Sequence, residues 1–195
     1  MSDSDPKNLF KLDPEERPRR PQVPARDPYS HLLGSAGHVG LILTPKQRAE
    51  LLDETRWSRA FDWPEIELLA NHMELQSVPA GEEIFREGEA GEYMGLVVRG
   101  RIAVLKEDSS GRRRRITTIV AGKTLGEMSL LDLEPRSATA VADADALLMV
   151  LTRKQYGKLM DNYPRLALKL LTNLARMMSQ RLRRTSGILV EFLED

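Results

Sequence analysis

Between residues 74 and 152 the sequence consists of short apolar runs separated by glycines at regular intervals. Runs of this length, with a turn signal roughly every 8–12 residues, are typical of β-sandwiches and β-barrels. The glycines that mark the turns are Gly81, Gly88, Gly91, Gly100, Gly111 and Gly122. One of them follows Arg99, and the apolar residues on both sides alternate, which predicts a hairpin there. The spacing predicts an antiparallel β-roll, a jelly-roll-like barrel, of about eight strands.

On both sides of this region, apolar residues recur with the spacing that is typical of helices. Thr44 and Pro45 form an N-cap followed by a proline at the first helical position, so we expect N-terminal helices over residues 44–73. Residues 153–195 predict a short helix and then a long one that begins at Pro164. The long helix carries an apolar stripe formed by Leu171, Leu174, Met178 and Leu182. The expected fold is therefore mostly β with flanking helices, including a long C-terminal helix.

Residues 1–43 differ from the rest of the chain. This segment holds six of the eleven prolines, and its charges are mixed in sign. Dense proline prevents helix ladders and favours extended, solvated chain. We expect a Pro-rich, mostly disordered N-terminal tail, of which residues 31–43 are apolar enough to be a candidate for docking on the domain.

The composition excludes several classes of protein. The formal net charge is zero, so no overall field attracts nucleic acid or membranes. Cysteine is absent, which excludes disulfides and thiol chemistry and fits a reducing cytoplasm. No apolar run approaches the ~20 residues of a membrane span, and the three histidines lie outside the expected strands. We therefore predict a cytoplasmic protein without a metal site, a membrane segment or an enzymatic nucleophile–base pair.

The stretch LGEMSLLDLEPRSAT, residues 125–139, combines groups that suit one kind of ligand. A glycine before a short helix frees backbone N–H groups for an anion. Arg136 supplies a planar fork of donors that fits a phosphate. Glu127 beside an anion makes sense only if it accepts a hydrogen bond from a neutral hydroxyl of the same ligand. Phosphate and hydroxyl together indicate a nucleotide.

This stretch resembles the phosphate-binding cassette of the cyclic nucleotide-binding domain, as found in protein kinase A regulatory subunits, cyclic-nucleotide-gated channels and catabolite activator proteins. The glycine-rich run EGEAGEYMGLVVRG is similar to the family's turn before the third barrel strand. The resemblance implies that Glu127 accepts the ribose 2′-hydroxyl and that Arg136 pairs with the cyclic phosphate. It also implies backbone or side-chain contacts for a further set of residues, namely Gly126, Met128, Ser129, Ser137 and Ala138. In the family the long C-terminal helix closes over the base, which places Arg181 near the ligand.

The function implied by this resemblance is a non-enzymatic receptor for cyclic nucleotides. Ser137 is compatible with cAMP, the preferred ligand, and leaves cGMP open. Ligand binding would move the C-terminal helices and so regulate an unknown effector protein, and the apolar stripe of the long helix predicts a homodimer. Direct DNA binding is not expected, because the sequence given ends about ten residues past the long helix. Two alternatives are a catabolite-activator-like transcription regulator without its own DNA-binding domain and a β-roll scaffold that binds no ligand.

A run of four arginines, residues 112–115, has two explanations. It is either a patch for nucleic acid or anionic lipid, or a solvated hairpin tip. The run follows Ser-Ser-Gly and the overall charge is balanced, so we favour the hairpin tip.

Overall fold

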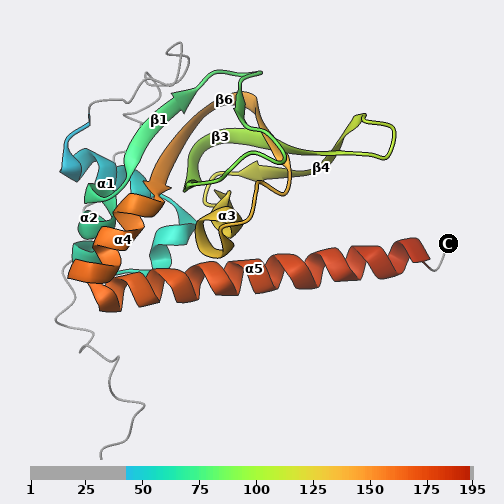
Figure 1. Ribbon diagram of the computed structural model, residues 1–195. Coiled ribbons are helices and arrows are strands. Elements are labelled where there is room, and N and C mark those ends of the chain that lie inside the picture. Colours follow the sequence, from blue (N-terminus) through green and yellow to red (C-terminus); the bar gives the residue numbers. More distant parts are fainter. Residues whose placement is uncertain (1–42, 194–195) are drawn as a thin grey trace, which may run out of the picture.

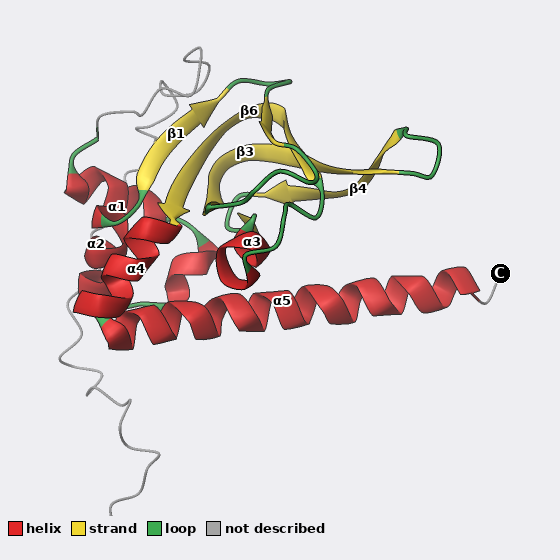
Figure 2. Ribbon diagram, in the orientation of Figure 1, coloured by secondary structure: helices red, strands yellow, loops and turns green. Residues whose placement is uncertain are grey.

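The computed structural model describes residues 43–193, so the predicted N-terminal tail lies outside the described residues except for Leu43. A curved sheet forms the centre of the fold, with helices gathered against one side of it and one long helix running past it (Figures 1 and 2). Within the described range, no helix is both long enough and apolar enough to cross a membrane.

The N-terminal helices begin at strong caps, as the sequence predicts. Helix α1 (Pro45–Asp53) is capped by Thr44, whose side-chain oxygen accepts a hydrogen bond from the Gln47 backbone N–H. A short 3₁₀ helix, η4 (Arg56–Ala60), leads to α2 (Trp63–Asn71), where a second capping box joins Asp62 and Glu65. Such caps satisfy backbone groups that a helix end leaves unpaired.

Every strand pairing in the sheet is antiparallel, and the main path runs in the order β1-β6-β3-β4. β2 also pairs with β6, and β5 also pairs with β3. The strands are β1 (Glu74–Val78), β2 (Glu83–Phe85), β3 (Tyr93–Glu107), β4 (Arg113–Val120), β5 (Thr124–Leu125) and β6 (Thr139–Thr152). The antiparallel roll is confirmed, but the described residues form six strands and not about eight.

The expected hairpin at Arg99 and Gly100 is wrong. β3 continues through both residues, and its register against β6 shifts there, which is the mark of β-bulges. Gly100 has a φ of 83°, and a Cβ at this position would lie 2.2 Å from the carbonyl oxygen of Asp145. A glycine inside a strand can mark a bulge where another backbone approaches closely. Runs that looked like separate strands are therefore joined in β3, and likewise in β6.

The two faces of β6 contact two different apolar clusters. Leu147 and Met149 pack with the helices, whereas Leu148 and Val150 pack inside the roll. This alternation is the period of a strand that is buried on both faces. β6 contributes side chains to both clusters and leads directly into the C-terminal helices. It therefore connects the interior of the roll to the helical layer.

The C-terminal helices are α4 (Arg153–Asn162) and α5 (Pro164–Leu193). The first turns of α5 pack in the helical cluster, where Leu174 is fully buried. Farther along, α5 extends past the roll, and Leu182 is 68% exposed (Figure 1). The predicted stripe is thus divided, since Leu174 belongs to the core while Leu171 and Leu182 face outward.

Candidate functional site

The residues of the predicted cassette meet where β5 leads into the short helix α3 (Glu127–Asp132). Gly126 sits at the start of α3 with a φ of 70°, in the left-handed region that favours glycine. A Cβ at this position would lie 2.2 Å from Nη1 of Arg136. The glycine therefore permits both the sharp turn into α3 and the close approach of the arginine.

Arg136 is a buried cation with incomplete hydrogen bonding. Only 3% of the residue is exposed, and its guanidinium lies 4.2 Å from the ring centre of Phe85 and 4.5 Å from that of Tyr93. Nη1 donates to the carbonyl of Gly126 at 2.9 Å. Nε and Nη2 are buried and find no partner among the described residues. Burial lowers the pKa of Arg136, and interactions with Tyr93 and then Glu127 oppose that shift.

Glu127, which is 2% exposed, is the second buried charge of the site. Its Oε1 accepts a hydrogen bond from Nη1 of Arg181 at 2.7 Å, while Oε2 is buried and has no partner in the described part of the chain. Arg181 also donates from Nη2 to the carbonyl of Thr124 at 3.1 Å. A side chain of α5 thus reaches the carboxylate of α3 across 54 residues of sequence.

A glycine-containing loop, residues 86–91, fixes the segment that carries Arg136. The Gly88 N–H donates to the carbonyl of Arg136 at 2.9 Å, and the Arg136 N–H donates to the carbonyl of Glu89 at 2.8 Å. A Cβ on Gly91 would lie 2.4 Å from Cβ of Ser129 and 2.9 Å from Nε of Arg136. The loop, α3 and the arginine are therefore in close mutual contact.

The structure brings the predicted site residues to this one region. Ser129 and Ala138 are buried there, while Ser137 and Met128 are exposed at its rim, with the Ser137 hydroxyl 4.0 Å from the Met128 sulfur. Together with Gly126, Glu127, Arg136 and Arg181 they make up the set that the sequence indicated. Their roles as ligand contacts stay predictions.

Sequence reasoning missed Arg153, the first residue of α4. Its Nη2 donates to the carbonyl of Ser129 at 2.7 Å and to that of Gly91 at 3.4 Å. Its backbone N–H donates to the carbonyl of Glu92 at 2.7 Å. Arg153 thereby connects α3 and the glycine loop to the C-terminal helices, and no local pattern around it signals this contact.

The aromatic pair Phe85 and Tyr93 was also missed. The rings lie 6.3 Å apart edge to face, and the Tyr93 hydroxyl donates to the carbonyl of Ile84 at 2.9 Å. Burial raises the pKa of Tyr93, so the phenol stays neutral. The signal that could have found them is their position, because the two aromatics flank the glycine loop in sequence.

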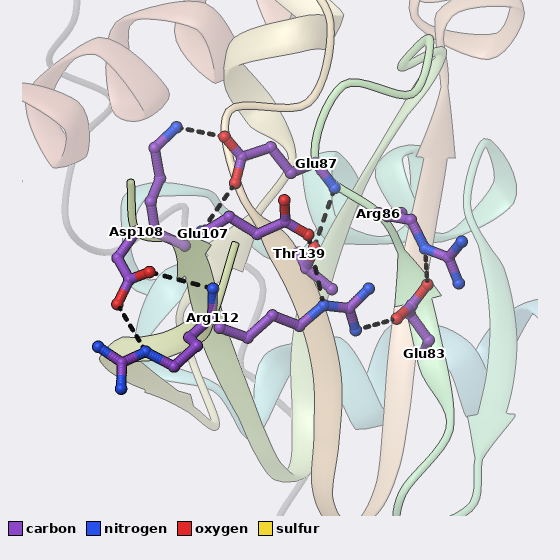
Figure 3. Close-up of polar contacts among 9 residues, drawn as sticks. Glu83, Arg86, Glu87, Glu107, Asp108, Arg112 and Thr139 are labelled. Atoms are coloured by element: carbon purple, nitrogen blue, oxygen red, sulfur yellow. Dashed lines mark hydrogen bonds and ion pairs between the residues drawn. The ribbon is translucent and has the colours of Figure 1, made fainter. Parts of the chain in front are cut away.

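Each arginine of the run 112–115 forms an ion pair, two of them with Asp108 in the hairpin between β3 and β4 and the other two with Glu83 on β2 and Asp143 on β6. Nitrogen–oxygen distances to carboxylates are 3.6 Å for Arg112, 2.7 Å for Arg113, 3.1 Å for Arg114 and 2.7 Å for Arg115. Figure 3 shows Arg112 beside Asp108, and Glu83 bound by two guanidinium groups. Hydrogen bonds from Ser110, from the Arg112 backbone and from Arg114 lower the pKa of Asp108 to about 2. These ion pairs favour the solvated hairpin over a patch for nucleic acid.

Fold and site together define a β-roll domain whose paired buried charges suit a ligand with both a phosphate and a hydroxyl. Residues 75–163 match the family model described as the cyclic nucleotide-binding domain. The match covers a little under half of the chain, which over these residues resembles the cyclic nucleotide-binding family. In the described part of the chain, no group of three or more histidine, aspartate or glutamate residues could hold a metal ion.

Two curated relatives illustrate the range of the family. The chain is 34% identical over 119 residues to the cyclic AMP receptor protein of Thermus thermophilus, covering 61% of this chain and 53% of that protein. It is 32% identical over 93 residues to a cAMP-dependent protein kinase regulatory subunit of Eremothecium gossypii, covering 48% and 19%. The chain thus spans about half of the first relative's length and about a fifth of the second's.

Solved structures agree on the fold. A cyclic nucleotide-binding domain from Methylobacillus flagellatus superposes with a TM-score of 0.66 at 27% identity, covering 75% of this chain and 82% of that one. The Thermus thermophilus catabolite activator protein superposes with a TM-score of 0.61 at 31% identity, covering 68% and 61%.

Proposed function

We propose that the protein is a non-enzymatic receptor for a cyclic nucleotide, with cAMP preferred, and that the ligand binds between Arg136 and Glu127. The observation that carries the proposal is the pair of buried, oppositely charged side chains with unused hydrogen-bonding atoms. A buried polar group without a partner costs roughly 1–3 kcal/mol, and more when it is charged. A ligand that supplies a phosphate to one and a hydroxyl to the other removes both penalties.

The buried hydrogen-bonding atoms that have no partner suggest which part of the ligand each side chain binds. Nε and Nη2 of Arg136 are donors for one edge of a cyclic phosphate, and Oε2 of Glu127 is an acceptor for the ribose 2′-hydroxyl. Hydrogen bonds to charged groups contribute roughly 1.5–3 kcal/mol each, while micromolar affinity needs about 8 kcal/mol. Three such hydrogen bonds contribute roughly 4.5–9 kcal/mol, so together with burial of the base they are sufficient for micromolar binding. Ser137, which is exposed at the rim, is proposed to contact the base.

The preference for cAMP rests on two supports. Ser137 stands where the family resemblance makes a serine compatible with cAMP. Both curated relatives described above carry cyclic AMP or cAMP in their names. The absence of cysteine fits the reducing cytoplasm, and the proposal includes that compartment.

Ligand binding is proposed to affect the effector protein through a change in the position of α5. Apolar residues at alternating steps of three and four lie on this helix at Leu168, Leu171, Ala175, Met178 and Leu182, and all are at least partly exposed. This is the spacing of a coiled-coil seam, so α5 is proposed to pair with a second copy of the chain. Ligand binding then shifts α5 relative to the roll and changes the contact with an effector protein. A transcription regulator without its own DNA-binding domain is one form that such a receptor can take.

Calorimetric titration with cAMP tests the binding site. The wild-type protein is expected to bind with micromolar or better affinity, whereas Arg136→Lys, which keeps the charge but loses the planar fork, should bind at least tenfold more weakly. Arg165→Ala, which removes an exposed arginine from α5, is the matched control and should bind normally. Urea unfolding of each variant shows whether the fold is intact. Absence of cAMP and cGMP binding by the folded wild-type protein would leave the ligand-free scaffold as the better interpretation.

A further inference from the structure

Lys106, near the end of β3, connects that strand to two other segments at the rim of the proposed site. Its Nζ donates to Oε1 of Glu87 at 2.6 Å and to the carbonyl of Ser137 at 2.8 Å. The other carboxylate oxygen of Glu87 accepts the backbone N–H of Glu107 at 3.3 Å. The hydrogen bond from Lys106, and then that from the Glu107 backbone, lower the pKa of Glu87, so the carboxylate stays ionised beside its lysine.

The glycine loop and the end of the cassette are also joined by bonds that involve the backbone. The Gly88 N–H donates to the Arg136 carbonyl, and the Arg136 N–H donates to the Glu89 carbonyl. The Glu87 N–H donates to Oγ1 of Thr139 at 3.0 Å (Figure 3). The backbone of Arg136 is thus fixed by the loop on both sides, whereas the carbonyl of the next residue is held by the lysine of β3.

Ser137 combines a restrained backbone with an available side chain. Its carbonyl accepts the hydrogen bond from Lys106, which restrains ψ of Ser137 and hence the direction of its Cα–Cβ bond. Its hydroxyl lies 4.0 Å from the sulfur of Met128, and a thioether sulfur is only a weak acceptor. The hydroxyl can therefore exchange this contact for a ligand atom without losing a strong hydrogen bond.

We infer that Lys106 is a positioning residue of the proposed site, which fixes the backbone of Ser137 so that its hydroxyl meets the base of the nucleotide. The inference rests on the proposed function, because that function assigns the base contact to Ser137. Glu87 holds the ammonium group of Lys106 from the other side. A hydroxyl that is already oriented loses less conformational freedom when the ligand binds, so its contact contributes more to affinity.

A double-mutant cycle measured by calorimetric titration with cAMP tests this role. Lys106→Met and Ser137→Ala should each weaken binding by about threefold to tenfold, because a neutral hydrogen bond contributes roughly that factor. The double variant should bind no more weakly than either single variant, since both changes remove the same contact. Lys106→Arg keeps charged donors at this position and should bind close to wild type. Lys158→Met removes an exposed lysine from α4 and is the matched control.

The charge of Lys106 requires a separate control, because a nearby cation attracts an anionic ligand whatever its contacts. Glu87→Ala removes a negative charge and leaves the lysine with one of its two partners. A field effect alone predicts tighter binding of cAMP by Glu87→Ala, whereas the positioning role predicts weaker binding. The Nε–H resonance of Arg136 in the cAMP complex should be the same in Lys106→Met as in wild type, because the backbone bonds of Arg136 remain.

The possible outcomes separate the inference from the function on which it rests. If the wild-type protein binds neither cAMP nor cGMP, the proposed function fails. If it binds cAMP and Lys106→Met binds equally well, the inference alone is wrong. The same holds if Lys106→Met causes its full loss of affinity in the Ser137→Ala background, or if Glu87→Ala binds cAMP more tightly than wild type. A loss confined to cGMP would make Lys106 a direct contact of the guanine base and would also overturn the inference.

Discussion

Gly91→Ala is predicted to impair ligand binding through a single added methyl group. The new Cβ would lie 2.4 Å from Cβ of Ser129, 2.8 Å from Oγ of the same residue and 2.9 Å from Nε of Arg136. Carbon atoms in good contact are roughly 3.5–4.0 Å apart, so the loop and α3 must separate by about 1 Å. Overpacking of this kind costs roughly 1–3 kcal/mol of folding free energy.

The substitution should weaken ligand binding by an amount comparable with its effect on folding. A shift of about 1 Å moves Nε of Arg136, one of the two donors proposed for the phosphate. Loss of one charge-assisted hydrogen bond, roughly 1.5–3 kcal/mol, corresponds to a tenfold or larger loss of affinity. Urea unfolding gives the change in stability, and calorimetric titration with cAMP gives the change in affinity.

Gly111→Ala is the matched control, because it lies in the hairpin between β3 and β4 and not in the loop that holds Arg136. Gly111 has a φ of 75° and no neighbour within 4 Å of an added Cβ. The alanine should therefore cost roughly 1–2 kcal/mol of backbone strain while leaving the affinity for cAMP close to wild type. Normal cAMP affinity for Gly91→Ala would refute the claim that this close contact positions Arg136.

Two further predictions concern acid stability and assembly. The pKa of Asp108 is about 2 in the folded protein, below its ordinary value, so its stabilising contribution is present above the ordinary pKa and is lost as the pH falls toward 2. Asp108→Asn should therefore lower the urea midpoint at pH 6 and have less effect at pH 2.5; an equal effect at both values would contradict the ion-pair account. Leu182→Glu should reduce the light-scattering mass from twice the 22.0 kDa chain mass to the chain mass, whereas Ile116→Glu, an exposed position on β4, should not. A wild-type mass of 22.0 kDa at high concentration would contradict pairing along α5.

The sequence predicted the local features of the fold because local chemistry determines them. Thr44 and Pro45 mark a helix start through capping and a preset φ, and the structure confirms this. Gly100 shows the limit of such reasoning. A glycine between two apolar runs fits a turn or a bulge equally well, and the choice depends on β6, which lies about 40 residues away in sequence and hydrogen-bonds to both halves of β3.

In the candidate site, too, the sequence predicted the residues that lie close together in the chain and missed contacts between residues that lie far apart. The spacing of Gly126, Glu127 and Arg136 indicated a common cassette, since these residues lie within one short stretch. The contact of Arg181 with Glu127 spans 54 residues, and that of Arg153 with Ser129 spans 24. Those contacts depend on how α4 and α5 pack against the roll, which no spacing in the sequence specifies.

The most direct test of the account is an NMR measurement of the Arg136 side chain in ¹⁵N-labelled protein. The Nε–H resonance can be assigned by its loss in Arg136→Lys, and it is followed as cAMP is added. If Nε donates to the cyclic phosphate, this resonance should move strongly downfield at saturation. An Nε–H resonance that stays in place while cAMP saturates the protein would show that the ligand binds without Arg136, and the central claim would be wrong.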